Sequence, residues 1–474
     1  IRRPPRSTPS NSSAASDVYK RQEGSPFKNN QYKIPNIVTE EVPGPRSREL
    51  YSKASEMKGF SSQVKLFPVA FESGDGFTLR DVDGNTYLDF ASGIYVTSLG
   101  HAHPKVSEAV AKWAKKLMNV HDFLTPIKAK AIEKIMEVLP DGYGGIQFYS
   151  EGSTVMEAGL RACRLYTGKN EFISCFTDFH GKTGHAVSLG RLQPANGVGR
   201  AQGFYMVPRP NPYRPYFTDD TGKIDTDKYL QFYDDFILEG TTGNISAFVL
   251  EPIQGWAGTV VPPDDFFPKL KKFLEKREIL LFADEILTGM GRTGKFLCME
   301  HWDVKPDIIA LGKSIGNGFP VTALVVKDSM ADSLDKISAS TSYGGNPMAC
   351  AAIVASIEVI QEERLLEHAL KLGEYFNKRM NEMKENHPIV GDVRGKGCLL
   401  GIELVKDRDS KEPFEKAGKM VYKKAFSKGL VWVPSRHVLR LSPPIIIPEK
   451  LAAKGMDIIE ESIYEVEKEL GYIN

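Results

Sequence analysis

Short runs of consecutive apolar residues recur through the middle of the chain and alternate with segments that have helical periodicity. The runs are IQFYS (146–150), EFISCF (171–176), AFVLEP (247–252), ILLFADE (279–285), DIIALGK (307–313) and TALVVKD (322–328). Apolar residues in direct succession are typical of strands that are buried on both faces of a sheet. Strands that alternate with helices predict an α/β domain with a mainly parallel sheet. Ligands of such sheets bind beyond the carboxyl ends of the strands.

The region before these runs has a different character. Residues 1–22 are rich in Ser, Pro and Arg, with Asp17 as their single acid, so we expect a non-native or disordered leader and exclude it from the fold. Residues 23–60 are polar, contain several prolines and are interpreted as an N-terminal arm. The segment FTLRDVDGNTYLDF (77–90) has Asp-Gly between alternating apolar residues, which predicts a β-hairpin.

Helical periodicity is strong at KVSEAVAKWAKKLM (105–118) and again at residues 348–383, where we expect one long helix with a bend. A smaller α+β unit follows, with the apolar segments GCLLGIELV, GLVWVP and VLRLSPPI. We therefore expect an arm and small-domain hairpin over residues 23–90, a large domain over 91–346 and a C-terminal small domain over 347–474.

Composition excludes several classes of protein. The formal net charge is +1 over 474 residues, so the chain has no basic field for nucleic acid or an anionic membrane surface. No apolar run approaches the length that spans a bilayer. The five cysteines form no CxxC pair, which argues against a zinc site or a disulfide framework and favours a reducing, cytoplasmic compartment. We expect no nucleic-acid partner, no membrane partner and no metal.

An acid and an amine follow two of the predicted strands. Asp284 lies near the end of ILLFADE, before Glu285, and a carboxylate there needs a partner because a lone buried charge is costly. It is either a helix cap or ion-pair acid, or the partner of a pyridinium nitrogen. Lys313 directly follows an apolar strand and precedes glycines. It either reaches solvent or is an amine of lowered pKa that forms an imine with an aldehyde.

Two further features are compatible with a cofactor. Gly152 and Ser153 lie between a predicted strand and a predicted helix, where free backbone N–H groups suit a phosphate, although Ser153 could simply cap the helix. Phe179 in DFHG could stack on a planar ring, although a single aromatic residue is usually part of the core.

In their order and spacing these residues resemble the class III aminotransferases, the omega or 4-aminobutyrate type, of the fold-type I pyridoxal-phosphate superfamily. The resemblance covers roughly residues 70–450 and is most specific at LLFADEILTGMGRTGKF and PDIIALGKSIGNGFP. GHAHP, EPIQG and GGNPMACAA are further landmarks. It implies a large domain with a mainly parallel seven-stranded sheet, a smaller α+β domain, and pyridoxal 5'-phosphate as the cofactor.

The resemblance also implies roles for individual residues. Lys313 would form the Schiff base and move the proton of the reaction, and Asp284 would pair with the pyridine nitrogen. Gly152 and Ser153 would hold the phosphate. The two faces of the ring would be covered by Phe179 and Ile286.

Three more positions match residues of the family. Glu251 matches an acid that stands behind the cofactor. Ser342 matches a Thr that reaches the phosphate of the neighbouring subunit, which implies a homodimer with shared active sites, or a tetramer built from it. Arg440 in VLRLSPP matches the arginine that binds the substrate carboxylate, a bidentate task suited to guanidinium.

The chain departs from the family pattern at several positions. Leu287 stands where members usually have Gln, and SEGSTVME keeps only part of the usual phosphate motif. Trp256 replaces a Glu that is common in 4-aminobutyrate and ornithine aminotransferases, which weakens either assignment. With Tyr95 nearby, Trp256 suggests a roomier apolar pocket for a hydrophobic amine or amino acid, although it could equally be a packing residue at a domain or subunit contact.

The expected activity is ping-pong transamination from an amine or amino acid, omega-amines included, to a keto acid such as pyruvate or 2-oxoglutarate. A decarboxylase, racemase or aminomutase would use the same lysine and ring. A binding protein without turnover would not need both Lys313 and Asp284. GMGRTGKF (289–296) nearly spells a nucleotide phosphate loop, but Phe296 replaces the Ser or Thr that holds magnesium.

Overall fold

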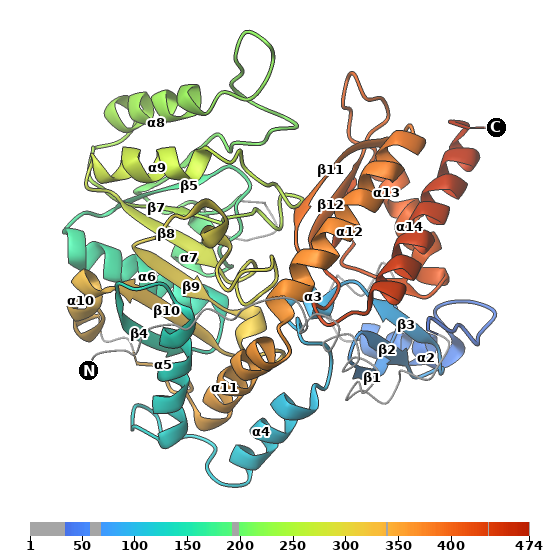
Figure 1. Ribbon diagram of the computed structural model, residues 1–474, viewed down its shortest axis with the longest axis horizontal. Helices are drawn as coiled ribbons and strands as arrows, with labels where there is room; N and C mark the ends of the chain where they lie inside the picture. The colour runs from blue at the N-terminus through green and yellow to red at the C-terminus, as the bar shows by residue number, and fades with distance from the viewer. Residues whose placement is uncertain (1–33, 57–67, 192–198, 338–339, 435, 474) are drawn as a thin grey trace, which may run out of the picture.

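The computed structural model describes residues 34–56, 68–191, 199–337, 340–434 and 436–473 (Figure 1). The leader expected at residues 1–22 and the first part of the N-terminal arm lie outside the described residues. Within the described part, no helix is both long enough and apolar enough to span a membrane.

A seven-stranded sheet forms the centre of the larger part of the molecule (Figure 1). Its order is β4 (Tyr143–Tyr149), β10 (Thr322–Lys327), β9 (Ile308–Leu311), β8 (Leu280–Glu285), β7 (Ile245–Leu250), β5 (Glu171–Cys175) and β6 (Phe204–Val207). β10 is antiparallel to both of its neighbours, and the other pairs are parallel. All six predicted apolar runs are strands of this sheet. The four-residue β6 was missed because its apolar run is short and only half of it is buried.

The strands are apolar throughout because helices cover both faces of the sheet. Ala247 and Val249 of β7 pack with α6 (Gly152–Thr167) in one core cluster. Phe248 and Leu250 of the same strand pack in another cluster with α8 (Thr226–Gly240) and α9 (Phe266–Glu275). Successive side chains of a strand point to opposite faces, so consecutive apolar residues are required here.

Two smaller sheets form the other part of the molecule. One has the order β1 (Phe71–Asp75), β2 (Thr78–Asp81), β3 (Thr86–Asp89) and β13 (Leu430–Val431). The antiparallel pairing of β2 with β3 confirms the predicted hairpin, and β3 also pairs in parallel with β13, from near the far end of the chain. The other sheet is antiparallel, with the order β11 (Val390–Lys396), β12 (Leu399–Leu404) and β14 (Val438–Leu441).

Helices surround these sheets and join the two parts. The single bent helix expected over residues 348–383 is two helices, α11 (Pro347–Glu362) and α12 (Leu365–Asn386). Arg364 separates them with a φ of 53°, a left-handed backbone that no continuous α-helix contains. The other long helices are α2 (Pro45–Ser55), α4 (Pro104–Ala114), α5 (Pro126–Val138), α13 (Glu415–Ser427) and α14 (Glu449–Leu470).

Candidate active site

Three of the predicted site residues lie at the carboxyl ends of neighbouring strands. Glu251 follows β7, Asp284 is the penultimate residue of β8, and Lys313 follows β9 after a single glycine. These strands are adjacent in the sheet. Lys313 begins a short 3-10 turn (Lys313–Ile315) with a φ of 44°. Burial lowers the pKa of Lys313, and the negative charges of Asp284 and Glu251 oppose that shift only in part.

Asp284 is buried and has a charged partner that the sequence analysis did not identify. His180 Nδ1 lies 2.8 Å from Asp284 Oδ2, and the Ile286 N–H donates to Asp284 Oδ1 at 3.1 Å. On its other side, His180 Nε2 lies 3.5 Å from Asp178 Oδ2, which is ion-pair range rather than a good hydrogen bond. Burial would lower the pKa of His180, but the two carboxylates raise it to about 10. His180 is therefore an imidazolium between two acids at neutral pH.

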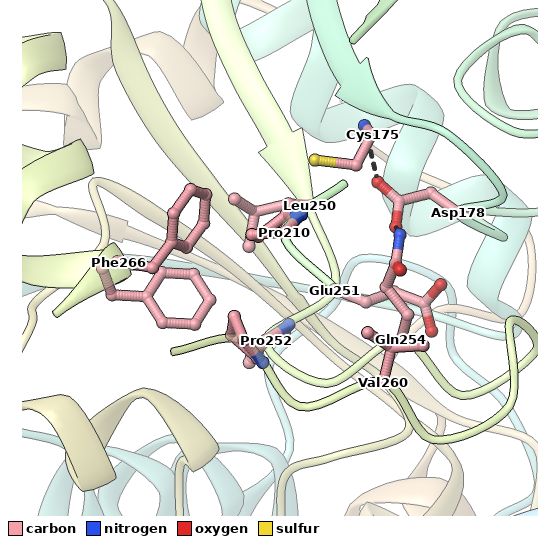
Figure 2. A pocket seen from close by; sticks show the side chains of 11 residues that line it. Cys175, Asp178, Pro210, Leu250, Glu251, Pro252, Gln254, Val260 and Phe266 are labelled. Carbon is pink, nitrogen blue, oxygen red and sulfur yellow. Dashed lines mark hydrogen bonds between the residues drawn. The ribbon is translucent and has the colours of Figure 1, made fainter. Parts of the chain in front are cut away.

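Asp178 is fixed by the loop around it (Figure 2). The Cys175 N–H donates to Asp178 Oδ2 at 2.9 Å, and Gln254 Nε2 donates to Oδ1 at 2.5 Å. Asp178 and His180 follow a fully buried strand, β5, with one residue between them. Two polar residues at that spacing, in the loop that follows a buried strand, are the sequence signal that could have identified the pair.

Glu251 connects two loops rather than facing a cation. Its carboxylate accepts from the Phe179 N–H and from the Gly255 N–H, both at 2.9 Å. Burial and the nearby Asp178 raise the pKa of Glu251 to about 8. The cavity beside it in Figure 2 holds only about 20 Å³, room for one water molecule and not for a substrate.

Gly152 opens helix α6, and the residue before it provides no side-chain cap. The first N–H groups of a 16-residue helix are therefore available to an anion. Ser153 Oγ accepts from the Lys182 N–H at 3.2 Å, so its side chain ties this turn to the Phe179 loop. A Cβ on Gly152 would lie 3.4 Å from Ile286 Cδ1, and one on Gly312 would lie 2.8 Å from Ile286 Cγ2. Ile286 thus packs between the turn at Gly152 and the turn that carries Lys313.

Aromatic rings and a guanidinium form the other wall. The centroids of Phe179 and Trp256 are 5.8 Å apart, and Arg440 Cζ lies 4.4 Å from the Trp256 centroid. Arg440 is 2% exposed, yet no carboxylate of the described chain lies within ion-pair distance of it, and its Nε has no hydrogen-bond acceptor. Tyr95 is also buried, its hydroxyl has no partner within the described chain, and burial raises its pKa.

Ser342 is not brought together with these residues. It is exposed, and its carbonyl oxygen accepts from Asn119 Nδ2 at 2.7 Å. Large exposed hydrophobic residues lie close to this contact in the sequence: Met118, Phe123, Leu124 and Tyr343. In the described ranges no set of His, Cys, Asp and Glu side chains is arranged to hold a metal.

The arrangement fits a phosphorylated pyridine aldehyde. It offers an amine of lowered pKa, an acid buried beside an imidazolium, an open helix N-terminus and a partly exposed aromatic ring. Within the described residues, Arg440 Nε and the Tyr95 hydroxyl are buried polar atoms of this wall without a hydrogen-bond partner, and a polar group of the substrate would satisfy both.

Comparison with known proteins agrees with this chemistry. Residues 60–463 match the family model described as aminotransferase class-III. The chain is 34% identical to an alanine/serine racemase of Pyrococcus horikoshii, over 90% of this chain and 92% of the relative. It is 32% identical to an acetylornithine aminotransferase of Methanocaldococcus jannaschii, over 85% and 95%. The omega transaminase of Pseudomonas jessenii, solved in complex with PMP, superposes with a TM-score of 0.84 at 25% identity, over 89% of this chain and 99% of that one.

Proposed function

The chain belongs to the class III aminotransferase family, which uses pyridoxal phosphate, and from that premise we propose that it transaminates α-amino acids with apolar side chains. In this proposal the amino group passes to a keto acid such as pyruvate or 2-oxoglutarate. Omega-amines, which have no α-carboxylate, are weaker donors.

The observation that carries the proposal is the state of Arg440. A buried guanidinium without an anion is costly, and Arg440 has no carboxylate partner among the described residues. In Trp256 it has an aromatic face, which attracts the cation without neutralising it. A substrate carboxylate would supply the missing charge, which an amine without a carboxylate cannot do.

The walls beside Arg440 support an apolar side chain. Trp256, Phe179 and Tyr95 present mainly carbon surface, and no acid from this wall would bind a second amino group. The Tyr95 hydroxyl, whose pKa is raised by burial, stays protonated and can donate to the substrate carboxylate.

The residues have distinct tasks in this mechanism. Gly152 and Ser153 would hold the phosphate, Phe179 and Ile286 the ring faces, and Asp284 the ring nitrogen. When bound, pyridoxal phosphate attaches to an amine through its aldehyde and withdraws electrons from the substrate Cα.

Proton transfer falls to Lys313. Its Nζ would accept the Cα proton of the substrate. It would later donate a proton to the aldehyde carbon of the cofactor. Burial suits this task because it lowers the pKa of the amine toward neutrality. His180 holds a positive charge 2.8 Å from Asp284 Oδ2 and so orients the carboxylate that would face the ring nitrogen.

We further propose that the enzyme is a homodimer in which Ser342 faces the active site of the partner subunit. The exposed apolar side chains of Phe123, Leu124 and Tyr343 beside the Asn119–Ser342 contact would be covered in that assembly. The five cysteines are free and buried, which supports a reducing, cytoplasmic location.

A half-reaction tests transamination. The holoenzyme is mixed with one amino acid, such as L-alanine or L-leucine, and no keto acid. We expect the visible absorbance of the bound cofactor to disappear while one equivalent of keto acid forms per site. Retention of the visible band with every amino acid, and no keto acid, would refute the proposal.

A second candidate is amino-acid racemisation, because a relative at 34% identity over 90% of this chain is an alanine/serine racemase. The same Arg440 and Lys313 would serve. The same experiment in deuterium oxide separates the two functions. Inversion of configuration with deuterium at Cα, and without stoichiometric keto acid, identifies a racemase.

A further inference from the structure

Arg292 is the most deeply buried arginine of the described chain and lies outside the site described above. It is 0% exposed, and none of the described carboxylates is within ion-pair distance of it. Burial lowers its pKa to about 10, so it remains a cation at neutral pH. It belongs to GMGRTGKF, the segment that resembled a nucleotide phosphate loop, but the next helix there is a five-residue 3-10 turn (Cys298–Trp302). A phosphate-loop role is therefore wrong.

The guanidinium instead binds oxygen atoms from three separate segments. Arg292 Nη1 donates to the carbonyl oxygens of Pro443 at 2.5 Å and Cys398 at 3.3 Å. Arg292 Nη2 donates to Ser98 Oγ at 2.6 Å. Backbone bonds join the same segments, from the Cys398 N–H to the Arg292 oxygen and from the Ile445 N–H to the Ser98 oxygen.

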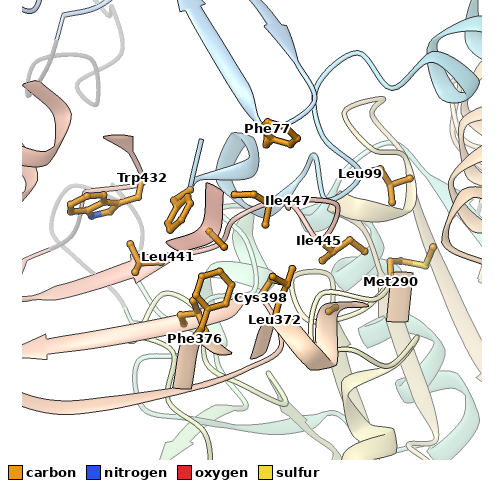
Figure 3. Close-up of a cluster of buried hydrophobic side chains, with 14 of the residues drawn as sticks. Phe77, Leu99, Met290, Leu372, Phe376, Cys398, Trp432, Leu441, Ile445 and Ile447 are labelled. Atoms are coloured by element: carbon orange, nitrogen blue, oxygen red, sulfur yellow. The ribbon is translucent and has the colours of Figure 1, made fainter. Parts of the chain in front are cut away.

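These bonds are buried with Arg292 beside a large apolar cluster. Leu99, Met290, Leu441 and Ile445, neighbours of the bonded residues, pack with Cys398 in one cluster (Figure 3). A charged donor in such surroundings makes strong, directional hydrogen bonds, because water does not compete for its acceptors.

From Ser98 the chain of hydrogen bonds has one direction only. A guanidinium only donates, and the single hydroxyl hydrogen of Ser314 points to a carbonyl oxygen that can only accept, so the hydrogen between the two serines, 2.5 Å apart, comes from Ser98. Ser314 in turn donates to the Tyr95 carbonyl oxygen at 3.3 Å. Ser314 directly follows Lys313, whose positive φ depends on the way this turn is held. At the opposite end, Pro443 is three residues beyond Arg440.

We propose that Arg292 is a positioning residue that joins the segment carrying Arg440 to the turn of Lys313 and the backbone of Tyr95. Through this connection, binding of a carboxylate at Arg440 changes the protonation equilibrium at the Lys313 site. The inference rests on the proposed carboxylate site at Arg440. It adds to that site a physical connection between substrate recognition and the proton-transferring amine. Coupling between two sites is reciprocal, so the protonation state of the lysine site also changes the affinity for the carboxylate.

The test uses the visible absorbance of the holoenzyme, which needs no turnover. The pH midpoint of that band is measured with and without propionate, a carboxylate that has no amino group to react. We expect propionate to shift the pH midpoint of the wild type. The shift should correspond to a difference of on the order of fivefold or more between the affinities of the two protonation states for propionate. In Arg292→Lys and in Ser98→Ala the shift falls to less than about half of the wild-type value, because either change breaks the connection.

Ser442→Ala is the matched control. It removes a 3.0 Å hydrogen bond from Ser442 Oγ to the Ala91 oxygen, which joins the same parts of the molecule without involving Arg292, and it keeps the full shift. Ser98→Ala removes one hydroxyl and carries the test if Arg292→Lys does not fold.

An equal shift in all variants would overturn the role of Arg292 and leave the proposed function standing. A wild-type midpoint that propionate leaves unmoved would also overturn the coupling. In that case, competition between propionate and an amino acid decides separately whether the Arg440 site exists.

Discussion

Replacing Asp178 by Asn removes one of the two carboxylates that face the buried His180. The pKa of His180 is about 10 in the folded protein, against an ordinary value of 6.5. At about 1.4 kcal/mol per unit, this net shift, in which the two acids outweigh the opposing effect of burial, is equivalent to roughly 5 kcal/mol in favour of the folded state. Both acids contribute to this shift, Asp178 from 3.5 Å and Asp284 from 2.8 Å. We assign about 2 kcal/mol of unfolding free energy to Asp178.

The pH dependence gives this prediction its sign. A group whose pKa is raised by folding stabilises the protein fully below its unfolded pKa and ceases to do so as the pH rises through its folded pKa. The deficit of Asp178→Asn is therefore full below about pH 6.5 and narrows as the pH approaches 10. Urea unfolding of the wild type and the variant, at one protein concentration and a series of pH values, measures this difference.

Gln254→Leu is the control without a charge change. It removes the hydrogen bonds from Gln254 Nε2 to Asp178 and to the Phe176 oxygen, at a cost of about 1–2 kcal/mol. That deficit should be the same at neutral and alkaline pH. If the deficit of Asp178→Asn is just as independent of pH, His180 is not the imidazolium described here.

Three further changes test the site. Arg440→Ala should lower kcat/KM for an α-amino acid about 100-fold or more, because the substrate carboxylate loses its cationic partner. A comparable loss for an amine without a carboxylate would contradict the assignment. Trp256→Leu removes the aromatic face from that guanidinium and should weaken propionate binding by up to about tenfold, whereas Trp256→Phe keeps most of it in the same spectral titration. Gly312→Ala should cost about 1–3 kcal/mol in urea unfolding, because the new Cβ meets Ile286. In a protein that already carries Ile286→Ala, Gly312→Ala should cost less than it does in the wild type. Strict additivity of the two changes would show that the clash is not the cause.

The sequence predicted the central sheet well for a physical reason. A strand covered on both faces must be apolar at every position, and such runs are visible without knowledge of any contact. The location of Asp284, Lys313 and Glu251 followed from the same rule, because the carboxyl ends of neighbouring parallel strands meet at one edge.

Long-range contacts could not be predicted in this way. His180 was overlooked beside the more conspicuous Phe179, because its role depends on two acids, one of them 104 residues away. Arg292 was assigned only to a motif, since no local pattern shows that an arginine will be buried among carbonyl oxygens. The break at Arg364 within the predicted long helix reflects a single left-handed residue, and helical periodicity continues on both sides of it. The role of Ser342 depends on a second chain and stays a prediction.

The pairing of β3 with β13 has a consequence for the order in which the protein forms during synthesis. Leu88 of β3 is paired in parallel with Leu430 of β13, so the N-terminal hairpin must wait for nearly the whole remaining chain before its sheet is complete. At about 5–20 residues per second, the ribosome needs roughly 20–70 s to deliver β13 after β3. The seven-stranded sheet, whose strands all lie between these two, can assemble during that interval. The hairpin edge meanwhile stays unpaired in the nascent chain, where it is open to chaperones or to mispairing with another strand.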